Sequence, residues 1–416
     1  MKYVVVLGDG MADRPVPELG GRTPLQVARK PNIDSLARRG EVGLARTVPE
    51  SMPPASDVAN LAVMGYDPAL YYTGRSPLEA ISMGLRLAPD DVAYRCNLVT
   101  LEGAGAYEDR IMLDYCGGEI STEEGRELMA EVDRHMGRGS MSSKGGSADG
   151  PSFHGGISYR HCMIWKGGPE RCGLTPPHDI PLMRIGDYLP RGEANRPLLE
   201  LMRESNAFLE GHPVNRARIG KGLRPANSIW LWGEGRRPAI PSFRGKFGVE
   251  GAMISAVDLL KGLAICVGMR SVDVEGATGD IHTNFAGKAD AALRELDLGA
   301  DVVYVHVEAP DECGHRHEVQ NKVRSIELID ELVVGRIVAG LEARGGTYRM
   351  LVTPDHPTPL AIRTHSRDPV PFVLFDSSAP RGSDLDGYDE YEAAKTGIFV
   401  ERGHELMGRL LKAHGA

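Results

Sequence analysis

Carboxylate and imidazole side chains gather in four short segments of this chain, next to apolar runs that are typical of buried strands. The candidate residues are Asp9, Asp311, His315, Asp355, His356 and His365. In open α/β sheets, ligands collect beyond the carboxyl ends of the strands. Carboxylates and imidazoles together suit zinc, manganese or a similar divalent ion. The pattern therefore predicts that these six residues meet at one rim of a sheet and bind metal.

Each of these residues also fits a purely structural role when it is taken alone. Asp9 lies in a Gly-Asp-Gly sequence where a turn aspartate is common. Asp311 also fits as a helix cap with His315 on the helix surface, and Asp355 and His356 fit a turn between two prolines. Six such residues at the strand ends of one sheet favour the metal site. His306 lies within an expected strand and is predicted to belong to the core or to support the ligands.

One serine is the candidate nucleophile. The segment PPASDVANLAVMGYDP places Ser56 at the start of a helix expected to reach Met64. Serine is a favoured N-cap, so capping is the alternative role. The chain has no G-x-S-x-G sequence, so Ser56 needs another means of activation than a serine–histidine triad. A P-loop and a G-x-G-x-x-G motif after the first strand are absent too, which disfavours a P-loop kinase and a dinucleotide-binding site.

The elements that must position these residues alternate along the first and last thirds of the chain. Strand-like runs at 3–8 and 42–48 alternate with helical patterns at 32–40 and 56–64. Towards the other end, residues 253–262 are expected to form a helix that precedes a strand at 263–269. Alternating strands and helices predict a mostly parallel sheet that is covered by helices on both faces.

The middle of the chain has a different pattern. Two successive strand-like runs are followed by a helix that opens at Ser121, with Glu124 at capping-box spacing, and then by another strand. This order predicts a small α+β domain, residues 89–182, inserted into a core made of residues 1–88 and 183–416. The Gly/Ser-rich segment 137–152 is predicted to be a loop.

Composition limits the classes of function. A formal net charge of −9 argues against broad binding to nucleic acid or to an anionic membrane. The six cysteines form no C-x-x-C pair, and the apolar runs are too short to span a bilayer. The start of the chain lacks the features of a signal peptide. A cytoplasmic location is the simplest expectation, while the oligomeric state is left open.

Taken together, six motifs resemble a known family. They are LGDGMADRP, PPASDVANLAVMGYDP, YYTGRSPLEA, HVEAPDECGH, TPDHPTP and RTHSRDPVPF, and they occur in this order along the chain. The chain resembles the cofactor-independent (2,3-bisphosphoglycerate-independent) phosphoglycerate mutases of archaeal type, in the alkaline phosphatase superfamily. The resemblance implies a three-layer α/β/α core like that of alkaline phosphatase, with an inserted domain that covers the substrate.

The resemblance also implies roles for individual residues. Ser56 would attack phosphate and become phosphoserine, while a pair of divalent ions (manganese, zinc, cobalt or magnesium) replaces 2,3-bisphosphoglycerate as the cofactor. One ion would be held by Asp9, Ser56, Asp355 and His356. The other would be held by Asp311, His315 and His365. Metal coordination lowers the pKa of the serine hydroxyl and thereby supplies the activation that a triad would give.

Arginines are expected for the substrate, because a phosphoglycerate carries about three negative charges at neutral pH. The segment SIWLWGEGRRP nominates Arg236 and Arg237 for the phosphate, by resemblance to related mutases. Arg95 and Arg160, from the insert, are candidates to clamp the glycerate, and His154 has the same status. Exposed side chains on small-domain strands are the alternative for these three residues.

The predicted reaction is the interconversion of 3-phosphoglycerate and 2-phosphoglycerate in glycolysis or gluconeogenesis. The same ligand set also fits other metal-dependent phosphoryl transfers, namely a homoserine kinase-like activity, a phosphopentomutase or a phosphatase. A metal-stabilised binding protein without activity is a third reading, and the intact Ser56 with its six companion ligands speaks against it. The expected partner is a small phosphorylated substrate.

Overall fold

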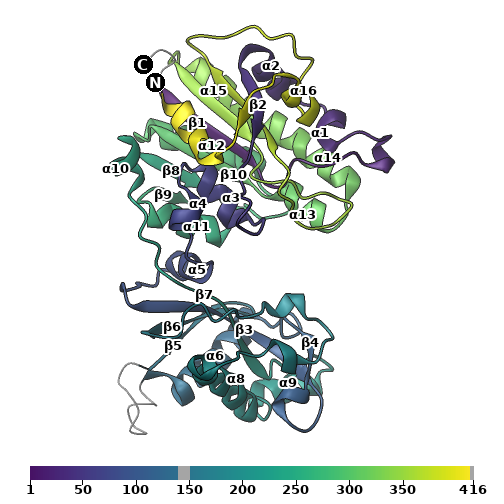
Figure 1. Ribbon diagram of the computed structural model, residues 1–416, viewed down its shortest axis with the longest axis vertical. Helices are drawn as coiled ribbons and strands as arrows, with labels where there is room; N and C mark the ends of the chain where they lie inside the picture. Colours follow the sequence, from purple (N-terminus) through teal and green to yellow (C-terminus); the bar gives the residue numbers. More distant parts are fainter. Residues whose placement is uncertain (139–149, 413–416) are drawn as a thin grey trace. The chain divides into compact units, whose positions relative to one another are not determined.

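The computed structural model describes residues 1–138 and 150–412, and it divides into two compact units (Figure 1). Unit 1 combines Met1–Tyr72 with Ala239–Ala416, and unit 2 is Thr73–Pro238. The predicted Gly/Ser-rich loop falls largely on residues 139–149, outside the described part of the chain. The candidate metal ligands and Ser56 all belong to unit 1.

Unit 1 is built on a sheet that has eight strands within the described residues, in the order β13-β2-β12-β11-β1-β10-β8-β9. In chain order these are β1 (Lys2–Gly8), β2 (Glu41–Ala45), β8 (Gly251–Ile254), β9 (Arg270–Val272), β10 (Val302–Val307), β11 (Tyr348–Thr353), β12 (Val370–Asp376) and β13 (Phe399–Val400). The strands β11, β1, β10, β8 and β9 run parallel to one another, and only β12 is antiparallel to its neighbours. The expected mostly parallel sheet is confirmed.

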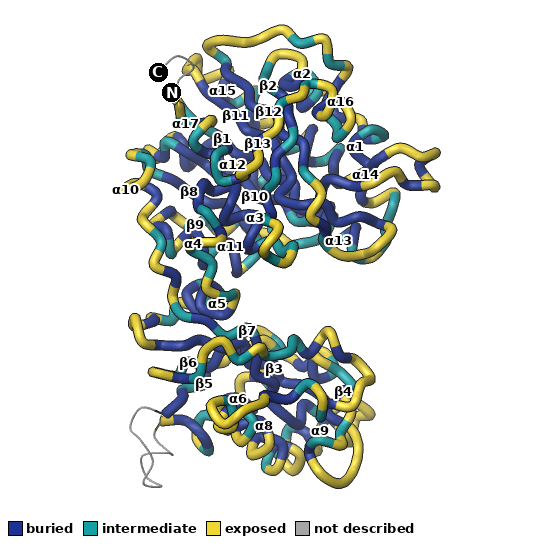
Figure 2. The backbone as a smooth tube through the Cα atoms, in the orientation of Figure 1, coloured by how far each residue is buried: buried dark blue, intermediate teal, exposed yellow. Residues whose placement is uncertain are grey.

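Helices cover both faces of this sheet (Figure 1). On one face, Val4 and Val6 of β1 pack in a core cluster with Ala289 of α12 (Phe285–Asp297) and Ile326 of α14 (Val319–Leu328). Val5 and Leu7 point to the other face and are fully buried as well. Strands that are buried on both faces are therefore continuous apolar runs, which Figure 2 shows as dark blue segments through the centre of the unit. The predicted three-layer α/β/α core is confirmed.

The helices of unit 1 have the following bounds: α1 (Pro24–Val27), α2 (Pro31–Arg39), α3 (Ser56–Val63), α4 (Pro68–Tyr71), α10 (Phe243–Phe247), α11 (Asp258–Cys266), α12 (Phe285–Asp297), α13 (Ala309–His315), α14 (Val319–Leu328), α15 (Arg336–Ala343), α16 (Glu390–Lys395) and α17 (Leu406–Leu411). A π-helical stretch, Ile329–Gly335, joins α14 to α15. Its Asp330 accepts hydrogen bonds from the backbone N–H groups of Asn32 and Ile33, and so fixes the start of α2.

The predicted positions of the helix and the strand within residues 253–269 were wrong. The apolar run that begins this segment is strand β8, and the helix α11 follows it and ends at Cys266. The next strand, β9, begins only at Arg270. A short apolar run carries no periodicity that separates a buried strand from the first turn of a buried helix.

Unit 2 contains a five-stranded antiparallel sheet within its described residues. Its strands are β3 (Asp91–Glu102), β4 (Ile111–Asp114), β5 (Ser152–Ile157), β6 (Arg160–Lys166) and β7 (Ser228–Arg236), and its helices are α5 (Ser76–Ser82), α6 (Thr122–Met136), α8 (Arg196–Leu209) and α9 (Pro213–Gly220). The unit extends beyond the expected insert, residues 89–182, on both sides. The reason is that β7 pairs along the length of β3, α8 packs on β7, and α5 contacts both strands.

Across the described residues, no helix combines the length and the apolar character that a membrane span requires.

Candidate metal centre and nucleophile

The sheet topology brings the candidate ligands to one rim of unit 1. The central strand β1 pairs in parallel with β10 on one side and with β11 on the other, so the carboxyl ends of all three strands lie together. Asp9 directly follows β1, and Asp311 and His315 lie on α13, two residues beyond β10. Asp355 and His356 follow β11. The six ligands that were predicted from spacing therefore occupy one edge of the sheet, with His365 in the segment that leads to β12.

One group of ligand atoms forms around His356. The side chains of Asp9, Asp355 and His356 offer ligand atoms that all lie within 4.8 Å of one another, and all three residues are buried. Nε2 of His356 lies 3.4 Å from Asp9 Oδ1 and 3.4 Å from Asp355 Oδ2. The hydroxyl of Ser56 lies 3.1 Å from the same nitrogen. The structure thus brings the four residues expected for one metal into contact.

Ser56 is not a helix cap. It is the first residue of α3, and the N-cap position is occupied by Ala55. Its hydroxyl points instead to the imidazole of His356, a residue 300 positions further along the chain. The capping alternative is therefore excluded.

A second group forms around Asp311. Nε2 of His315 lies 3.2 Å from Asp311 Oδ2, and Nε2 of His365 lies 3.4 Å from Asp311 Oδ1. The two Nε2 atoms are 3.0 Å apart. His356 also belongs to this cluster, because its ligand atoms lie within 4.8 Å of those of Asp311 and His365. One imidazole therefore stands between the two ligand groups.

Hydrogen bonds from the far side of the rings orient both distal imidazoles. Nδ1 of His315 lies 3.0 Å from the carbonyl oxygen of Arg363, and Nδ1 of His365 lies 3.3 Å from that of Pro54. A carbonyl only accepts, so each Nδ1 carries the proton and donates it. In the neutral ring this leaves the lone pair on Nε2, which is the arrangement typical of histidine ligands.

The charges of the site fit a cation. Burial, together with the nearby carboxylates of Asp355 and Asp311, raises the pKa of Asp9 well above its usual range. Oδ1 of Asp9 is buried and has no hydrogen-bond partner among the described residues. A buried polar atom without a partner is costly, and a buried charge is stable only when it is paired or binds a metal. Oδ1 of Asp9 lies 3.4 Å from Nε2 of His356. A divalent ion at this position would bind Oδ1 and offset the negative charge of the clustered carboxylates.

The pKa values of His315 and Asp311 also fit a cation. The hydrogen bond between His315 and Asp311 raises the pKa of His315 to about 9, so that without a cation this ring binds a second proton. For Asp311, burial raises the pKa, but the hydrogen bonds from His315 and His365 outweigh burial and hold the pKa well below its usual range. A cation at the Nε2 atoms would take the place of the shared protons.

Several residues that form hydrogen bonds to the candidate site were not predicted from the sequence. Asn60, one helical turn after Ser56, donates to Asp355 Oδ2 over 2.7 Å and to the carbonyl of Ser56 over 2.9 Å. Thr358 donates to Asp311, and Thr47 donates to the carbonyl of Asp355. The position of Asn60 at i+4 from Ser56, on the same helix face, is the one sequence signal that could have found it.

The expected substrate-binding residues lie in unit 2. Arg95 on β3 is buried and pairs with Glu79, and its guanidinium lies over Trp232 at 4.8 Å from the ring centre. Arg160 on β6 is exposed and lies over the ring of Tyr159. The strand register places Arg160 opposite Asn97 and His154 opposite Cys162, which itself faces Arg95. Arg95, Arg160 and His154 therefore share one face of this sheet.

The other nominated residues either contact a neighbouring side chain or are exposed. Nε2 of His154 lies 3.0 Å from the hydroxyl of Ser152, and burial lowers the pKa of this imidazole. Arg236 ends β7 and pairs with Glu170 at 2.6 Å. Arg237 follows it and is exposed.

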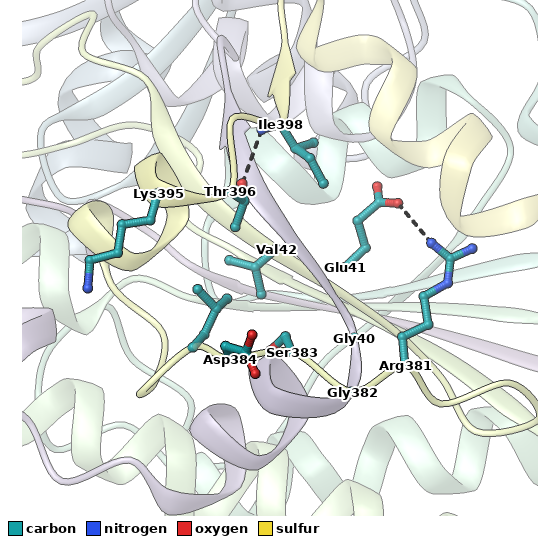
Figure 3. Close-up of a pocket in the computed structure, with 11 residues that line it drawn as sticks. Gly40, Glu41, Val42, Arg381, Gly382, Ser383, Asp384, Lys395, Thr396 and Ile398 are labelled. Atoms are coloured by element: carbon teal, nitrogen blue, oxygen red, sulfur yellow. Dashed lines mark hydrogen bonds and ion pairs between the residues drawn. The ribbon is translucent and has the colours of Figure 1, made fainter.

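A pocket of about 480 Å³ lies elsewhere in unit 1, against the start of β2 (Figure 3). Two ion pairs involve its lining residues: Arg381 with Glu41, and Lys395 with Glu392. Figure 3 shows Arg381 and Glu41 joined across one end of the pocket. It contains none of the candidate ligands.

Comparison with known proteins agrees with the motifs. The family model of 2,3-bisphosphoglycerate-independent phosphoglycerate mutase matches residues 37–215. A relative from Geobacter sulfurreducens, named a probable 2,3-bisphosphoglycerate-independent phosphoglycerate mutase, is 52% identical over 413 residues, covering 99% of this chain and all of the relative. A 2,3-bisphosphoglycerate-independent phosphoglycerate mutase from Methanothrix thermoacetophila is 51% identical over 411 residues, with coverage of 99% and 100%.

Solved structures agree over the whole length. A protein of Pyrococcus horikoshii has a TM-score of 0.80 at 30% identity, covering 100% of this chain and 99% of that one. The cofactor-independent phosphoglycerate mutase of Thermoplasma acidophilum has a TM-score of 0.64 at 26% identity, with 99% of each chain covered. The chain belongs to the 2,3-bisphosphoglycerate-independent phosphoglycerate mutases of archaeal type.

Proposed function

We propose that the chain interconverts 3-phosphoglycerate and 2-phosphoglycerate through a phosphoserine at Ser56. The observation that carries this proposal is the 3.1 Å approach of the Ser56 hydroxyl to Nε2 of His356, the ring common to both ligand groups. Ser56 also begins α3, whose first-turn N–H groups and positive dipole end favour a phosphate.

Two divalent ions complete the site in this proposal. Asp9, Ser56, Asp355 and His356 hold one ion, and Asp311, His315 and His365 hold the other. When bound, the ions lower the pKa of the serine hydroxyl and stabilise the phosphoryl group in transit. The support lies in the chemistry of the donor set: buried carboxylates, converging Nε2 atoms and the unsatisfied Oδ1 of Asp9.

The reaction conserves every atom. The Ser56 hydroxyl gives up its proton and its oxygen forms a bond to phosphorus, while the bond between phosphorus and the 3-oxygen of the glycerate breaks and the 3-oxygen takes up a proton. The 2-hydroxyl of the retained glycerate then gives up its proton and its oxygen bonds to phosphorus, while the bond between phosphorus and the Ser56 oxygen breaks and Ser56 takes up a proton. No 2,3-bisphosphoglycerate is required, because Ser56 holds the phosphate between the two steps.

The substrate residues in this proposal belong to unit 2. Arg75 and Arg160 both act electrostatically on Arg95, and Glu79 is the carboxylate that pairs with Arg75 and Arg95. Three guanidinium groups and one carboxylate leave an excess of positive charge, which suits a glycerate carboxylate. His154 shares this sheet face. Arg236 and Arg237 are proposed to bind the phosphate, on resemblance alone.

The test is a coupled enolase assay on metal-reconstituted protein. We expect isomerisation without added 2,3-bisphosphoglycerate, and its loss in Ser56→Ala with an unchanged melting temperature. Ser51→Ala, an exposed serine five residues earlier, is the matched control. Parallel assays with homoserine plus ATP, with phosphopentoses and with a generic phosphate ester separate the related activities. Isomerisation that survives in Ser56→Ala overturns the proposal.

A further inference from the structure

Three polar side chains form a line through the core of unit 1, one from each of three adjacent strands. Ser255 directly follows β8, His306 lies within β10 and Asp9 directly follows β1, in the order β8-β10-β1 of the sheet. Their exposed fractions are 3%, 0% and 2%. The Ser255 hydroxyl lies 3.2 Å from Nδ1 of His306, and Nε2 of His306 lies 2.9 Å from Oδ2 of Asp9.

The direction of these hydrogen bonds follows from their end groups. Oγ of Ser255 accepts the backbone N–H of Val257 over 3.0 Å, which leaves its own proton for His306 Nδ1. With Nδ1 as an acceptor, the ring proton lies on Nε2 and is donated to the Asp9 carboxylate. The backbone of His306 is fixed as well, because the buried ammonium of Lys288 donates to its carbonyl over 2.9 Å.

The two carboxylate oxygens of Asp9 have different surroundings. Oδ2 is occupied by His306, whereas Oδ1 lacks a hydrogen-bond partner among the described residues and lies 3.4 Å from Nε2 of His356. A carboxylate held by one oxygen presents the other in a single direction. That direction is towards the group formed by Asp9, Asp355 and His356.

We propose that His306 is a positioning residue that aims Oδ1 of Asp9 at the metal held near Ser56, and that Ser255 fixes the tautomer with which it does so. The inference rests on the proposed metal site. Although the order serine–histidine–aspartate is that of a hydrolytic triad, Ser255 is buried and no substrate reaches it. Partners of this kind orient metal ligands, and their loss typically costs about 10–100-fold in metal affinity.

The experiment measures Mn²⁺ binding by titration calorimetry and by metal analysis, on chelator-treated protein. We expect His306→Leu, which removes the donor, to weaken one of the two ions by about 10–100-fold while the other stays bound. His306→Gln, whose amide N–H can reach the place of Nε2–H, is expected to retain both ions. Wild-type affinity for both ions in His306→Leu overturns the inference, as does equal loss in His306→Leu and His306→Gln.

A second measurement needs no core substitution that could prevent folding. Nitrogen-15 NMR of histidine-labelled, metal-free wild-type protein reports which ring nitrogen of His306 carries the proton. We expect Nε2–H; a ring with Nδ1–H overturns the inference. In Ser255→Ala the preference for Nε2–H should weaken. Neither metal binding nor the position of the ring proton depends on turnover, so both can be interpreted without the enolase assay. A wild-type protein that binds both ions as expected but is inactive would contradict the proposed function and not this inference.

Discussion

The hydroxyl of Ser56 and the imidazole of His356 meet at 3.1 Å although 300 residues separate them in the chain. Ser56 is placed by the start of α3 and His356 by the end of β11, and Asn60 links the two segments by donating both to the Ser56 carbonyl and to Asp355. Ser56 is therefore held against the candidate ligand cluster by the backbone on both sides.

Removal of one ligand should empty one metal position and spare the other. Asp311→Ala or His365→Ala is expected to lower bound Mn²⁺ from two ions towards one. Activity should fall by more than the roughly 10–100-fold that a lost supporting residue costs. Metal analysis after gel filtration measures the first quantity. His317→Asn is the control, because His317 bonds to the carbonyl of Leu360 outside the cluster. Two tightly bound ions in Asp311→Ala would refute the assignment.

The phosphate should be carried by Ser56 and not by a histidine. We expect activity without added 2,3-bisphosphoglycerate and resistance to vanadate, which traps histidine-based mutases. Labelled phosphate trapped by acid quenching should map to Ser56 by peptide mass spectrometry. Label on a histidine would require a different mechanism.

Arg160 and Arg95 should respond differently to truncation. Arg160 is exposed, so Arg160→Ala should leave stability unchanged and raise the ratio of phosphate release to isomerisation, because the glycerate is held less well. Arg95 is buried with Glu79, and Arg95→Ala leaves that carboxylate without its main partner, at a cost of about 3–5 kcal/mol. Urea unfolding and the two product assays measure these effects. Arg191→Ala, a surface arginine of unit 2, is the control; an unchanged product ratio in Arg160→Ala would exclude its role.

A buried ion pair should be essential to unit 1. Nζ of Lys322 lies 2.8 Å from Asp13, both side chains are almost fully buried, and the ammonium also donates to the carbonyl of Thr358 near the ligands. Lys322→Met leaves the Asp13 carboxylate buried without its cation, which is expected to cost about 3–5 kcal/mol. Lys395→Met, whose largely exposed ammonium pairs with Glu392, should cost less than about 1 kcal/mol. Equal unfolding midpoints in urea for both variants would contradict this expectation.

Glu390 should make the stability of unit 1 depend on pH. Burial raises its pKa from 4.5 to about 7, so the folded chain keeps a proton that the unfolded chain releases. This contribution to stability is fully present below about pH 4.5 and is lost as pH rises through about 7. Above that pH, Glu390 is ionised in both states and its contribution no longer changes with pH. In Glu390→Gln the amide oxygen can accept the Asp13 N–H and the amide NH2 can donate to the Thr23 hydroxyl, so both contacts remain without the charge.

The measurement for Glu390 is urea unfolding of both proteins at pH 5 and pH 8. From pH 5 to pH 8, Glu390→Gln should gain on the order of 1–3 kcal/mol relative to wild type. Glu401→Gln, at an exposed pair with Arg46, is the matched control. A difference between wild type and Glu390→Gln that does not vary with pH would show that Glu390 does not titrate in this range.

Local patterns predicted where most candidate ligands lie, because Asp9, Asp311, His315, Asp355 and His356 come after strands that are apolar on both faces. These strands end at the same rim, whereas His365 precedes β12. The segment 253–269 shows where such patterns fail, since its first apolar residues fit either a strand or a helix until β8 pairs with β10. The extent of unit 2 was missed for a similar reason. Its last strand, β7, joins β3 across more than a hundred residues, and no local signal marks that pairing.

The sequence by itself determined the α/β alternation and supplied the candidate ligands and the candidate nucleophile, because residue type and strand order are local properties. Only the tertiary structure decided how the ligands divide, with His356 between the two groups, since that depends on which side chains face each other across β1, β10 and β11. It also decided that His306 contacts Asp9, that Lys322 pairs with Asp13 and that Arg95 pairs with Glu79. Such partners are selected by burial, because a polar group removed from water must find its partner wherever the fold supplies one.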